Sequence, residues 1–401
     1  MTRRPKESPP GFPVSRIQTL TDSGINPAGV RYLEELSPRE MSMYLLDVGD
    51  ILFSHINSEP QLGRAVLYTG KPRQLIHGMN LLRLSVDSSI LDARFLEYLL
   101  RWYRYQHAFV KLAGRAVGQS SINQGRLRQL RIPVPSGSEQ RAIANVLHAV
   151  QRAKEQTEQV IAAARELKRS LIEELLSRGV TLKENTGHDK TAHIGMKPDQ
   201  GWTVMALGDV TEPPQYGYTA TATEEPVGPR FLRITDIQDG HVKWATVPFC
   251  NCDEQARKRL SLSSGDLLIA RIGATTGKSF LVVESPRDAV FASYLIRIRP
   301  KDKLDAVYLS YFTQSSFYWS QINSQKGGRL KVGVNAPILR ELRLPLPPLT
   351  KQREIAGVLF AVDRKIGAEE ERREGLEQLF RTLLHELMTG RIRLTDWPEV
   401  A

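Results

Sequence analysis

The stretch "SINQGRLRQLRIPVPSGSEQRAIANVLHAVQR", residues 121–152, has a close copy further along this chain. The copy, "GVNAPILRELRLPLPPLTKQREIAGVLFAVDR", covers residues 333–364 and aligns with the first stretch without a gap, at a constant offset of 212 residues. The shared residues include the pairs Asn123/Asn335 and Gln140/Gln352. A period of this length is far too long for a solenoid, so it indicates that a whole domain and its following helix are duplicated.

A long helix is expected after the proline-rich centre of each copy. The segments "PVP" and "PLPP" disfavour helix, whereas apolar residues downstream recur at alternating spacings of three and four, as in a coiled-coil seam. The predicted seam residues are Ile143, Val146, Val150, Ala153, Thr157, Val160, Ala164, Leu167 and Leu171 in the first copy, and Ile355, Val358, Val362, Glu369, Arg372, Leu376, Leu379, Leu383 and Leu387 in the second. Each helix would be roughly 60 Å long. An amphipathic helix packed on its own domain is the alternative, but so long a stripe exceeds the size of a small domain.

The segments before these helices have a mixed composition. Short β-branched runs such as "GDLLIARIGATTGK" and "VGDILFSHINS" indicate strands and hairpins, and each set of strands is followed by a helical pattern. The expected fold class is therefore α+β, with two mixed α/β domains separated by two long helices that form an antiparallel coiled coil, in a pseudo-two-fold internal repeat. The expected divisions are a first domain at 1–138, a helix at 139–178, a polar linker at 179–201, a second domain at 202–350, a helix at 351–390 and a tail at 391–401.

The charge of the chain points to a polyanionic partner. The 401 residues carry a net charge of +11, which suits nucleic acid binding, although a basic protein kept soluble by its charge is the alternative. Cys250 and Cys252 are the two cysteines, and their spacing fits neither a disulfide framework nor a zinc site. The N-terminus lacks the apolar core of a signal peptide, and no apolar run is long enough for a membrane span. A cytoplasmic protein without a membrane partner is expected.

The stretch "ARIGATTGKSF", residues 270–280, resembles a phosphate-binding loop. Its glycine is followed by three rather than four residues before Gly277-Lys278, and a β-branched run follows where a helix is required. We expect a strand–turn–strand hairpin. An ATP-binding protein that uses the Gly273–Ser279 loop is the alternative.

The sequence provides no catalytic constellation. It has no N-P-P-[YF] motif, no glycine-rich adenosylmethionine loop and no H-E-x-x-H spacing, and Asp236 and Asp239 read as turn residues rather than magnesium ligands. We therefore expect a reader of nucleic acid without a catalytic site, a metal or a cofactor.

Reading DNA requires phosphate contacts for affinity and side chains that reach base edges for specificity. The candidates lie in or beside expected loops, and each is as readily a solvated surface charge. They are Arg230, Arg233, Arg271, Thr275, Thr276, Lys278, Lys326, Arg329 and Lys331 in the second domain, and His55, Asn57, Arg64, Lys71, Arg73, Arg115 and Gln119 in the first. Asn123 and Asn335 are shared by both copies, which favours a turn or backbone role over base readout.

The repeat, "GDLLIARIGATTGK", "NAPILRELRLPLPPLTKQREIAGVL" and the linker that ends in "GW" together resemble the specificity subunit of type I restriction-modification enzymes over nearly the whole chain. The resemblance implies two target-recognition domains that each read half of a split site in double-stranded DNA. It also implies a coiled coil that sets the spacing and docks two methyltransferase (modification) subunits, with restriction (translocase) subunits joining for cleavage. A coiled-coil scaffold that does not bind DNA is the remaining alternative.

One feature departs from the family's pattern. The second copy begins with "GWTVMALGDV", the family's usual entry to a recognition domain. No such strand led by a tryptophan precedes "GVRYLEEL" in the first copy, which puts the edge strand of the first domain in doubt.

Overall fold

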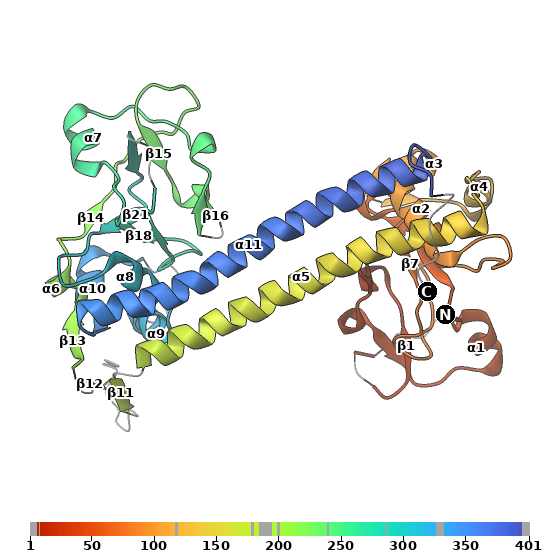
Figure 1. Cartoon of the computed structure of the whole chain (residues 1–401), viewed down its shortest axis with the longest axis horizontal. Coiled ribbons are helices and arrows are strands. Elements are labelled where there is room, and N and C mark those ends of the chain that lie inside the picture. Colours follow the sequence, from red (N-terminus) through yellow and green to blue (C-terminus); the bar gives the residue numbers. More distant parts are fainter. Residues whose placement is uncertain are drawn as a thin grey trace. The chain divides into compact units, whose positions relative to one another are not determined.

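The chain forms two compact units. A computed structural model describes residues 6–7, 9–116, 119–177, 180–183, 195–198, 201–238, 240–284, 286, 288–325 and 333–394. The first unit comprises Met1–Val160 with Glu369–Ala401, and the second comprises Ile161–Ala368. Each unit therefore contains one mixed domain and part of both long helices (Figure 1).

The mixed domain of the first unit is built on a three-stranded antiparallel sheet of order β7-β5-β8. Its central strand β5 is buried along its whole length, with Ile51 opposite Leu67 on one side and Leu84 on the other. The elements are β1 Phe12–Val14, β2 Leu20–Thr21, β3 Gly24–Ile25, β4 Arg31–Leu33, α1 Pro38–Tyr44, β5 Ile51–Ser54, β6 Ile56–Asn57, β7 Ala65–Leu67, β8 Leu81–Leu84, α2 Ala93–Tyr105, α3 Ala108–Leu112, β9 Gly114–Ala116, β10 Gln119–Ser121 and α4 Gln124–Arg128.

The second unit repeats this plan around a four-stranded sheet of order β14-β21-β18-β19. Its central strand β18 is likewise fully buried, with Leu267 opposite Leu281 and Ile298. The elements are β11 Val180–Lys183, β12 Gly195–Pro198, β13 Thr203–Ala206, α6 Leu207–Val210, β14 Gln215–Tyr216, β15 Arg230–Leu232, β16 Ile237–Gln238, β17 His241–Val242, α7 Glu254–Leu260, β18 Leu267–Ala270, β19 Ser279–Leu281, β20 Ala289–Phe291, β21 Leu295–Ile298, α8 Ala306–Phe312, α9 Ser316–Gln325, α10 Ala336–Glu341 and β22 Arg343–Leu346.

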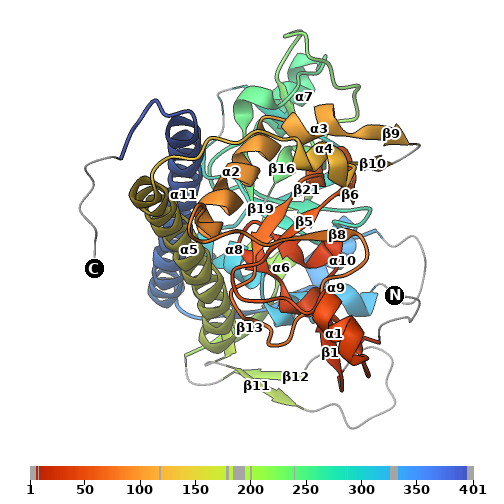
Figure 2. The ribbon, with the colours of Figure 1, turned by 90° about the vertical axis from the view of Figure 1, so that its right-hand side faces the viewer.

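Two long helices, α5 (Gly137–Ser177) and α11 (Leu349–Met388), take part in both units. The beginning of α5 and the end of α11 pack in the core of the first unit, and the end of α5 and the beginning of α11 pack in the core of the second. Lys154 pairs with Glu377 in the first unit, and Lys168 pairs with Asp363 in the second. The two helices therefore lie side by side and antiparallel within each unit (Figure 2), which confirms the predicted fold class.

The predicted seam is correct for one series of residues and only partly correct for the other, in which Val146 packs against the core of the first unit. Thr157 is buried as expected, but Val160 and Leu167 are exposed, and the residue after each predicted position takes its place: Leu147 and Ile161 are buried. Lys154 and Lys168 also belong to this second series, with their stems packed and their ammonium groups paired across the seam. Apolar spacing does not recognise Lys154 and Lys168 as seam residues. The predicted series therefore lies one residue before the observed one.

The second helix shows the same shift. Val358 and Leu379 are exposed, as is Arg372, whereas Leu359 and Phe380 are buried. The displacement by one residue again affects one series only, because Ile355, Glu369 and Leu387 are buried as predicted.

The residues shared by the two copies join each helix to its domain. Gln140 and Gln352, both almost fully buried, sit near the start of α5 and α11. In the second unit, Gln352 accepts a hydrogen bond from the Asp305 N–H at 2.8 Å and donates two to the carbonyls of Lys303 and Pro347, both at 2.9 Å. Gln140 makes the same three bonds in the first unit, to the N–H of Asp92 and to the carbonyls of Ile90 and Pro135.

The edge strands of the two domains differ. In the second unit, β13 pairs antiparallel with β22, the proline-containing segment just before α11. The corresponding segment of the first unit, residues 131–135, has no strand assignment and no paired strand within the described residues. The departure noted in the sequence thus has a counterpart in the structure.

Candidate nucleic-acid interface

The loop "ARIGATTGKSF" is the turn of a β-hairpin. Strand β18 leads into it and strand β19 follows it in antiparallel pairing, so no helix begins after Lys278. The Ala270 and Gly277 N–H groups donate to the carbonyls of Lys278 and Ala270, each at 2.8 Å. A phosphate-binding loop needs a helix N-terminus, so the alternative of an ATP-binding loop is wrong.

The same hairpin frame occurs in the first unit. The Ser54 and Gly63 N–H groups donate to the carbonyls of Arg64 and Ser54, again each at 2.8 Å. Gly63 and Gly277 both have positive φ, +78° and +89°, and a Cβ at Gly63 would lie 2.1 Å from the Phe109 ring. Both turns therefore require glycine, and a basic residue follows it in each unit.

The two equivalent basic residues have different surroundings. Lys278 is exposed and has no ion pair among the described residues. Arg64 points inward, where it donates to the Leu20 carbonyl at 2.9 Å and lies 3.5 Å from the Asp22 carboxylate. Burial alone would raise the pKa of Asp22, but Arg104 and the neighbouring arginines lower it overall. Arg64 thus belongs to an internal charge network, whereas Lys278 is free to meet a phosphate.

Two predicted arginines of the second unit are engaged within the protein. Arg230 stacks over the Phe249 ring at 4.1 Å and donates to the Ala245 and Val247 carbonyls. Arg233 forms two hydrogen bonds to Asp236, at 2.8 Å and 3.1 Å. These contacts give both residues structural roles.

The hydroxyl of Thr276 is also used internally. Thr276 is buried, and its Oγ1 donates to the Gly273 carbonyl at 2.7 Å, while Thr275 is half-buried in the same turn. Thr276 therefore has a structural role in the turn.

Arg271 and His55 occupy equivalent positions directly after the central strands. The guanidinium of Arg271 lies 4.9 Å from the centre of the Tyr216 ring, and its Nε is buried without a hydrogen-bond partner among the described residues. The Nδ1 of His55 is likewise buried and unpartnered within the described residues, and burial lowers the pKa of this imidazole.

The remaining candidates fall into three groups. Asn57 is held locally, by bonds to the Ser54 hydroxyl and the Ser58 N–H, and Lys71 and Arg73 are exposed in the turn after β7. Arg115 and Gln119 lie in the paired strands β9 and β10, where the structure describes their backbone. Lys326, Arg329 and Lys331 lie outside the described residues.

The shared asparagines cap short helices. Asn123 Oδ1 accepts from the Gly125 N–H at the start of α4, and Asn335 Oδ1 accepts from the Ile338 N–H at the start of α10. This is the backbone role that their presence in both copies suggested.

Sequence reasoning missed the apolar and aromatic side chains beside Arg271. Ile272 and Tyr294 are exposed next to it, and the Tyr294 carbonyl accepts from the Arg271 N–H at 3.0 Å. The available signal was an aromatic residue, Tyr294, in a loop between two strands.

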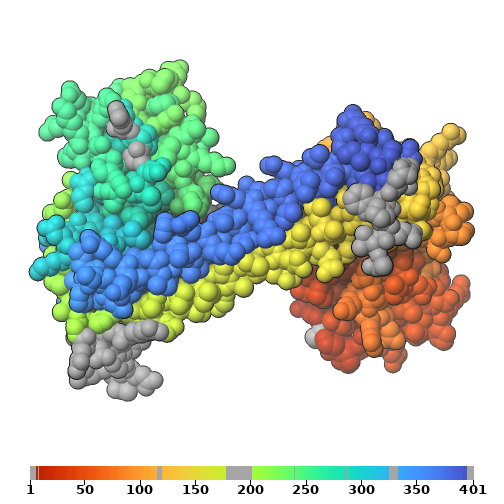
Figure 3. Space-filling view, in the orientation of Figure 1, coloured from red at the N-terminus to blue at the C-terminus, as the bar shows by residue number. Residues whose placement is uncertain are grey.

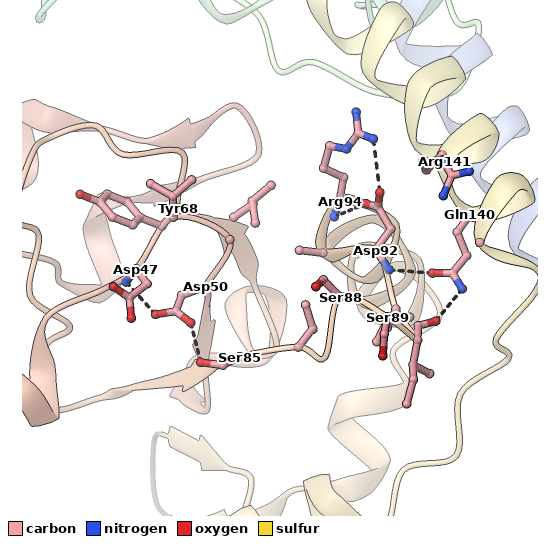
Figure 4. A pocket seen from close by; sticks show the side chains of 18 of the residues that line it. Asp47, Asp50, Tyr68, Ser85, Ser88, Ser89, Asp92, Arg94, Gln140 and Arg141 are labelled. Carbon is pink, nitrogen blue, oxygen red and sulfur yellow. Dashed lines mark hydrogen bonds and ion pairs between the residues drawn. The ribbon is translucent and has the colours of Figure 1, made fainter. Parts of the chain in front are cut away.

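A pocket of about 760 Å³ lies in the first unit between the sheet and the starts of α2 and α5 (Figure 4). Its lining includes the carboxylates of Asp47, Asp50 and Asp92. Asp50 accepts from the Ser85 hydroxyl and the Asp47 N–H, and Asp92 caps α2. These three carboxylates outnumber the guanidinium groups of Arg94 and Arg141, which also line the pocket, so it is a poor candidate for the nucleic-acid interface.

The described residues contain neither a metal-binding cluster nor a membrane-spanning helix. No group of three or more His, Cys, Asp or Glu side chains there could hold a metal ion. No helix in the described part of the chain is both long and apolar enough to cross a membrane.

Known proteins match both halves of this arrangement. A family model described as the type I restriction modification DNA specificity domain matches residues 5–164 and again residues 199–378. The putative type I restriction enzyme MjaX specificity subunit of Methanocaldococcus jannaschii is 30% identical over 403 residues. The match covers 98% of this chain and 90% of the relative. The MjaVIII specificity subunit of the same organism is 24% identical over 321 residues, covering 79% and 74% of the two chains.

Solved structures support the same fold. The S subunit of a type I restriction-modification system from M. genitalium has a TM-score of 0.56 at 15% identity, with 96% of this chain and 92% of that chain covered. A chain from a structural study of the assembly of a type I system has a TM-score of 0.57 at 19% identity, with 95% and 92% covered. The chain therefore belongs to the type I restriction-modification DNA specificity family, as a specificity subunit that carries two copies of the family's domain.

Proposed function

We propose that this specificity subunit reads a split, asymmetric DNA site, with one half read by each mixed domain and an unread spacer between the halves. The observation that carries this proposal is the duplicated hairpin frame, whose backbone hydrogen bonds recur while the side chains beyond it differ. A common frame with different loops suits two readers of different half-sites. Two domains that recognise different half-sites would give a target sequence that is not palindromic.

The proposed second role of the chain is to dock two methyltransferase subunits on the outer faces of its long helices, with restriction subunits joining this assembly for cleavage. Leu167 and Leu379 are equivalent in the repeat, and both are exposed, at 52% and 46%. Both helices present an uncovered face in the space-filling view (Figure 3). Exposed leucines at repeated positions favour two copies of one partner over a single partner.

The helices would also set the spacer length. At about 1.5 Å per residue, removing one heptad from each helix shortens it by roughly 10 Å, the length of about three base pairs. We expect the variant that lacks residues 156–162 and 369–375 to direct methylation to a site with a shorter spacer and unchanged half-sites. Sequencing of modified bases in DNA from cells that carry the chain and its methyltransferase measures this.

The matched control replaces the same residues with a heptad of equal length and pattern, and it should leave the spacer as in the wild type. Altered half-sites in the deletion variant would refute the spacing role. A short uninterrupted palindrome as the wild-type target would overturn the proposal of two readers.

Lys278 is expected to contact a DNA phosphate. Replacing Lys278 with alanine should weaken DNA binding to specific and non-specific sequences alike and reduce the salt dependence of binding by about one counterion. Titration of the assembled complex against DNA at several salt concentrations measures the slope. Lys258→Ala is the control, because it removes an exposed lysine that pairs with Glu254. This variant should leave the slope unchanged. An unchanged slope for Lys278→Ala would remove this residue from the interface.

A further inference from the structure

His55 and Arg271, the residues that follow the central strands, have the same backbone hydrogen bond in the two units. The Ile122 N–H donates to the His55 carbonyl at 2.8 Å, and the Val334 N–H donates to the Arg271 carbonyl at 2.8 Å. In each unit the donor directly precedes the asparagine that caps the next short helix. The repeat therefore preserves the backbone at this position and changes the side chain from histidine to arginine.

Each side chain holds one buried nitrogen without a hydrogen-bond partner among the described residues, although the backbone of Asn80 also acts on the His55 imidazole and opposes the larger effect of burial on its pKa. The atoms are Nδ1 of His55 and Nε of Arg271. Buried polar atoms in proteins almost always have a partner, and an exception calls for a ligand, an ion or a functional role. Such atoms also occur at unrelated positions, for example Nδ1 of His77, so it is the equivalence of the two positions in the repeat that favours a common use.

The position opens toward the surface of its unit. Ile272 and Tyr294 are exposed beside Arg271, and Met79 is exposed in the corresponding loop before β8 in the first unit. The Tyr216 ring lies against the Arg271 guanidinium at 4.9 Å and limits its freedom. A stacked guanidinium loses little further entropy when it makes directional bonds.

We propose that this position reads a base edge in each half-site, with Arg271 reading a guanine in one half and His55 reading a base in the other. This inference rests on the proposed function, since it names the specificity-determining residue of each reader. Arginine presents two parallel N–H donors that match O6 and N7 of guanine in the major groove.

His55 offers different chemistry at the same place. Because burial lowers the pKa of His55, its imidazole is mostly neutral at pH 7 and presents one donor and one acceptor. It can make a single directional bond where Arg271 can make two. We therefore expect sharper base discrimination from Arg271 than from His55.

The experiment uses the full chain assembled with its methyltransferase subunits. The substrates are the wild-type DNA site and the set of its single-base substitutions, and the readout is the methylation rate of each. Arg271→His should lower discrimination at one G·C pair of one half-site by roughly 10- to 100-fold, with the other half-site and the spacer unchanged. His55→Arg should change preference at one position of the opposite half-site and nowhere else.

Two further variants keep the test decisive. Arg271→Lys retains the charge and the fold but loses the paired donors, so it should also relax the same G·C position. Arg259→His replaces an exposed arginine of α7 and should leave every base preference unchanged. Thermal unfolding of each variant identifies any loss of fold.

The outcomes separate this inference from the proposed function. Wild-type complex without sequence preference would overturn the proposed function. Wild-type specificity with unchanged base preferences in Arg271→Lys and His55→Arg would overturn this inference alone. Equal weakening at every substrate would show a phosphate contact instead of base readout, and it too would overturn the inference.

Discussion

Replacing Asp266 with asparagine is expected to lower the free energy of unfolding of the second unit by about 3–5 kcal/mol. Asp266 is 1% exposed and accepts from Arg297, itself 3% exposed, at 3.3 Å and from Arg299 at 2.8 Å. Asparagine keeps the shape of the side chain but removes the charge. The guanidinium of Arg297 is then left buried without its counter-ion, which is far costlier than the loss of a surface pair.

Hydrogen exchange of the amides of β18 and β21 measures this loss in the second unit directly. A chain with two units need not unfold in a single step, so a local measurement is preferable to one melting temperature. Asp288→Asn is the matched control, because Asp288 and its partner Arg257 are 40% and 48% exposed. The control should change stability by less than about 1 kcal/mol. Equal effects of the two substitutions would contradict the role given to Asp266.

Replacing Gln352 with alanine is expected to cost about 3 kcal/mol, because it removes three hydrogen bonds at once. The Asp305 N–H and the Lys303 and Pro347 carbonyls each lose their bond to this side chain. Gln352 is fully buried, so water cannot easily replace it. The loss would loosen the start of α11 from the loop that leads into α8.

Urea unfolding, combined with exchange at the α8 and α11 amides, measures this effect. Gln140→Ala should produce a similar loss in the first unit, because the same three bonds are made there. Gln314→Ala, which removes an exposed amide with one bond to the Ser310 carbonyl, should cost less than about 0.5 kcal/mol. Wild-type stability in Gln352→Ala would exclude the bridging role.

The glutamines and asparagines explain why the duplication was visible in the sequence. Gln140 and Gln352 bridge helix and domain, and Asn123 and Asn335 cap short helices. Each of these functions depends on the local backbone, which both copies retain. A gapless repeat of such residues was therefore sufficient to predict the fold class.

The helix seam was predicted in part for a related reason. One series of seam residues is apolar enough to be recognised by spacing alone, but the other includes Lys154 and Lys168. These lysines fit the seam because Glu377 and Asp363 neutralise them from the other helix. Their partners lie about 200 residues away in the chain, so a search by apolar spacing placed Val160 and Leu167 inward, whereas both face outward.

Which basic residues are available at the candidate interface depends even more on partners that are distant in the sequence. Lys278 and Arg64 follow equivalent glycines, yet only Lys278 remains exposed, because Asp22 and Leu20 engage Arg64 inside the first unit. Arg230 is similarly engaged by the Phe249 ring and nearby carbonyls. A basic residue in a loop has the same appearance in the sequence whether or not an acceptor is folded against it.

The sequence by itself determined the duplication, the two long helices and the family, because these depend on local hydrogen bonding and on spacing along the chain. Only the tertiary structure decided which face of each helix points outward and which basic side chains are left free. Those properties depend on charges and carbonyl groups that long-range folding brings together. The equivalence of His55 and Arg271 needed both, since the repeat aligns the two domains and the fold leaves their buried nitrogens without a partner among the described residues.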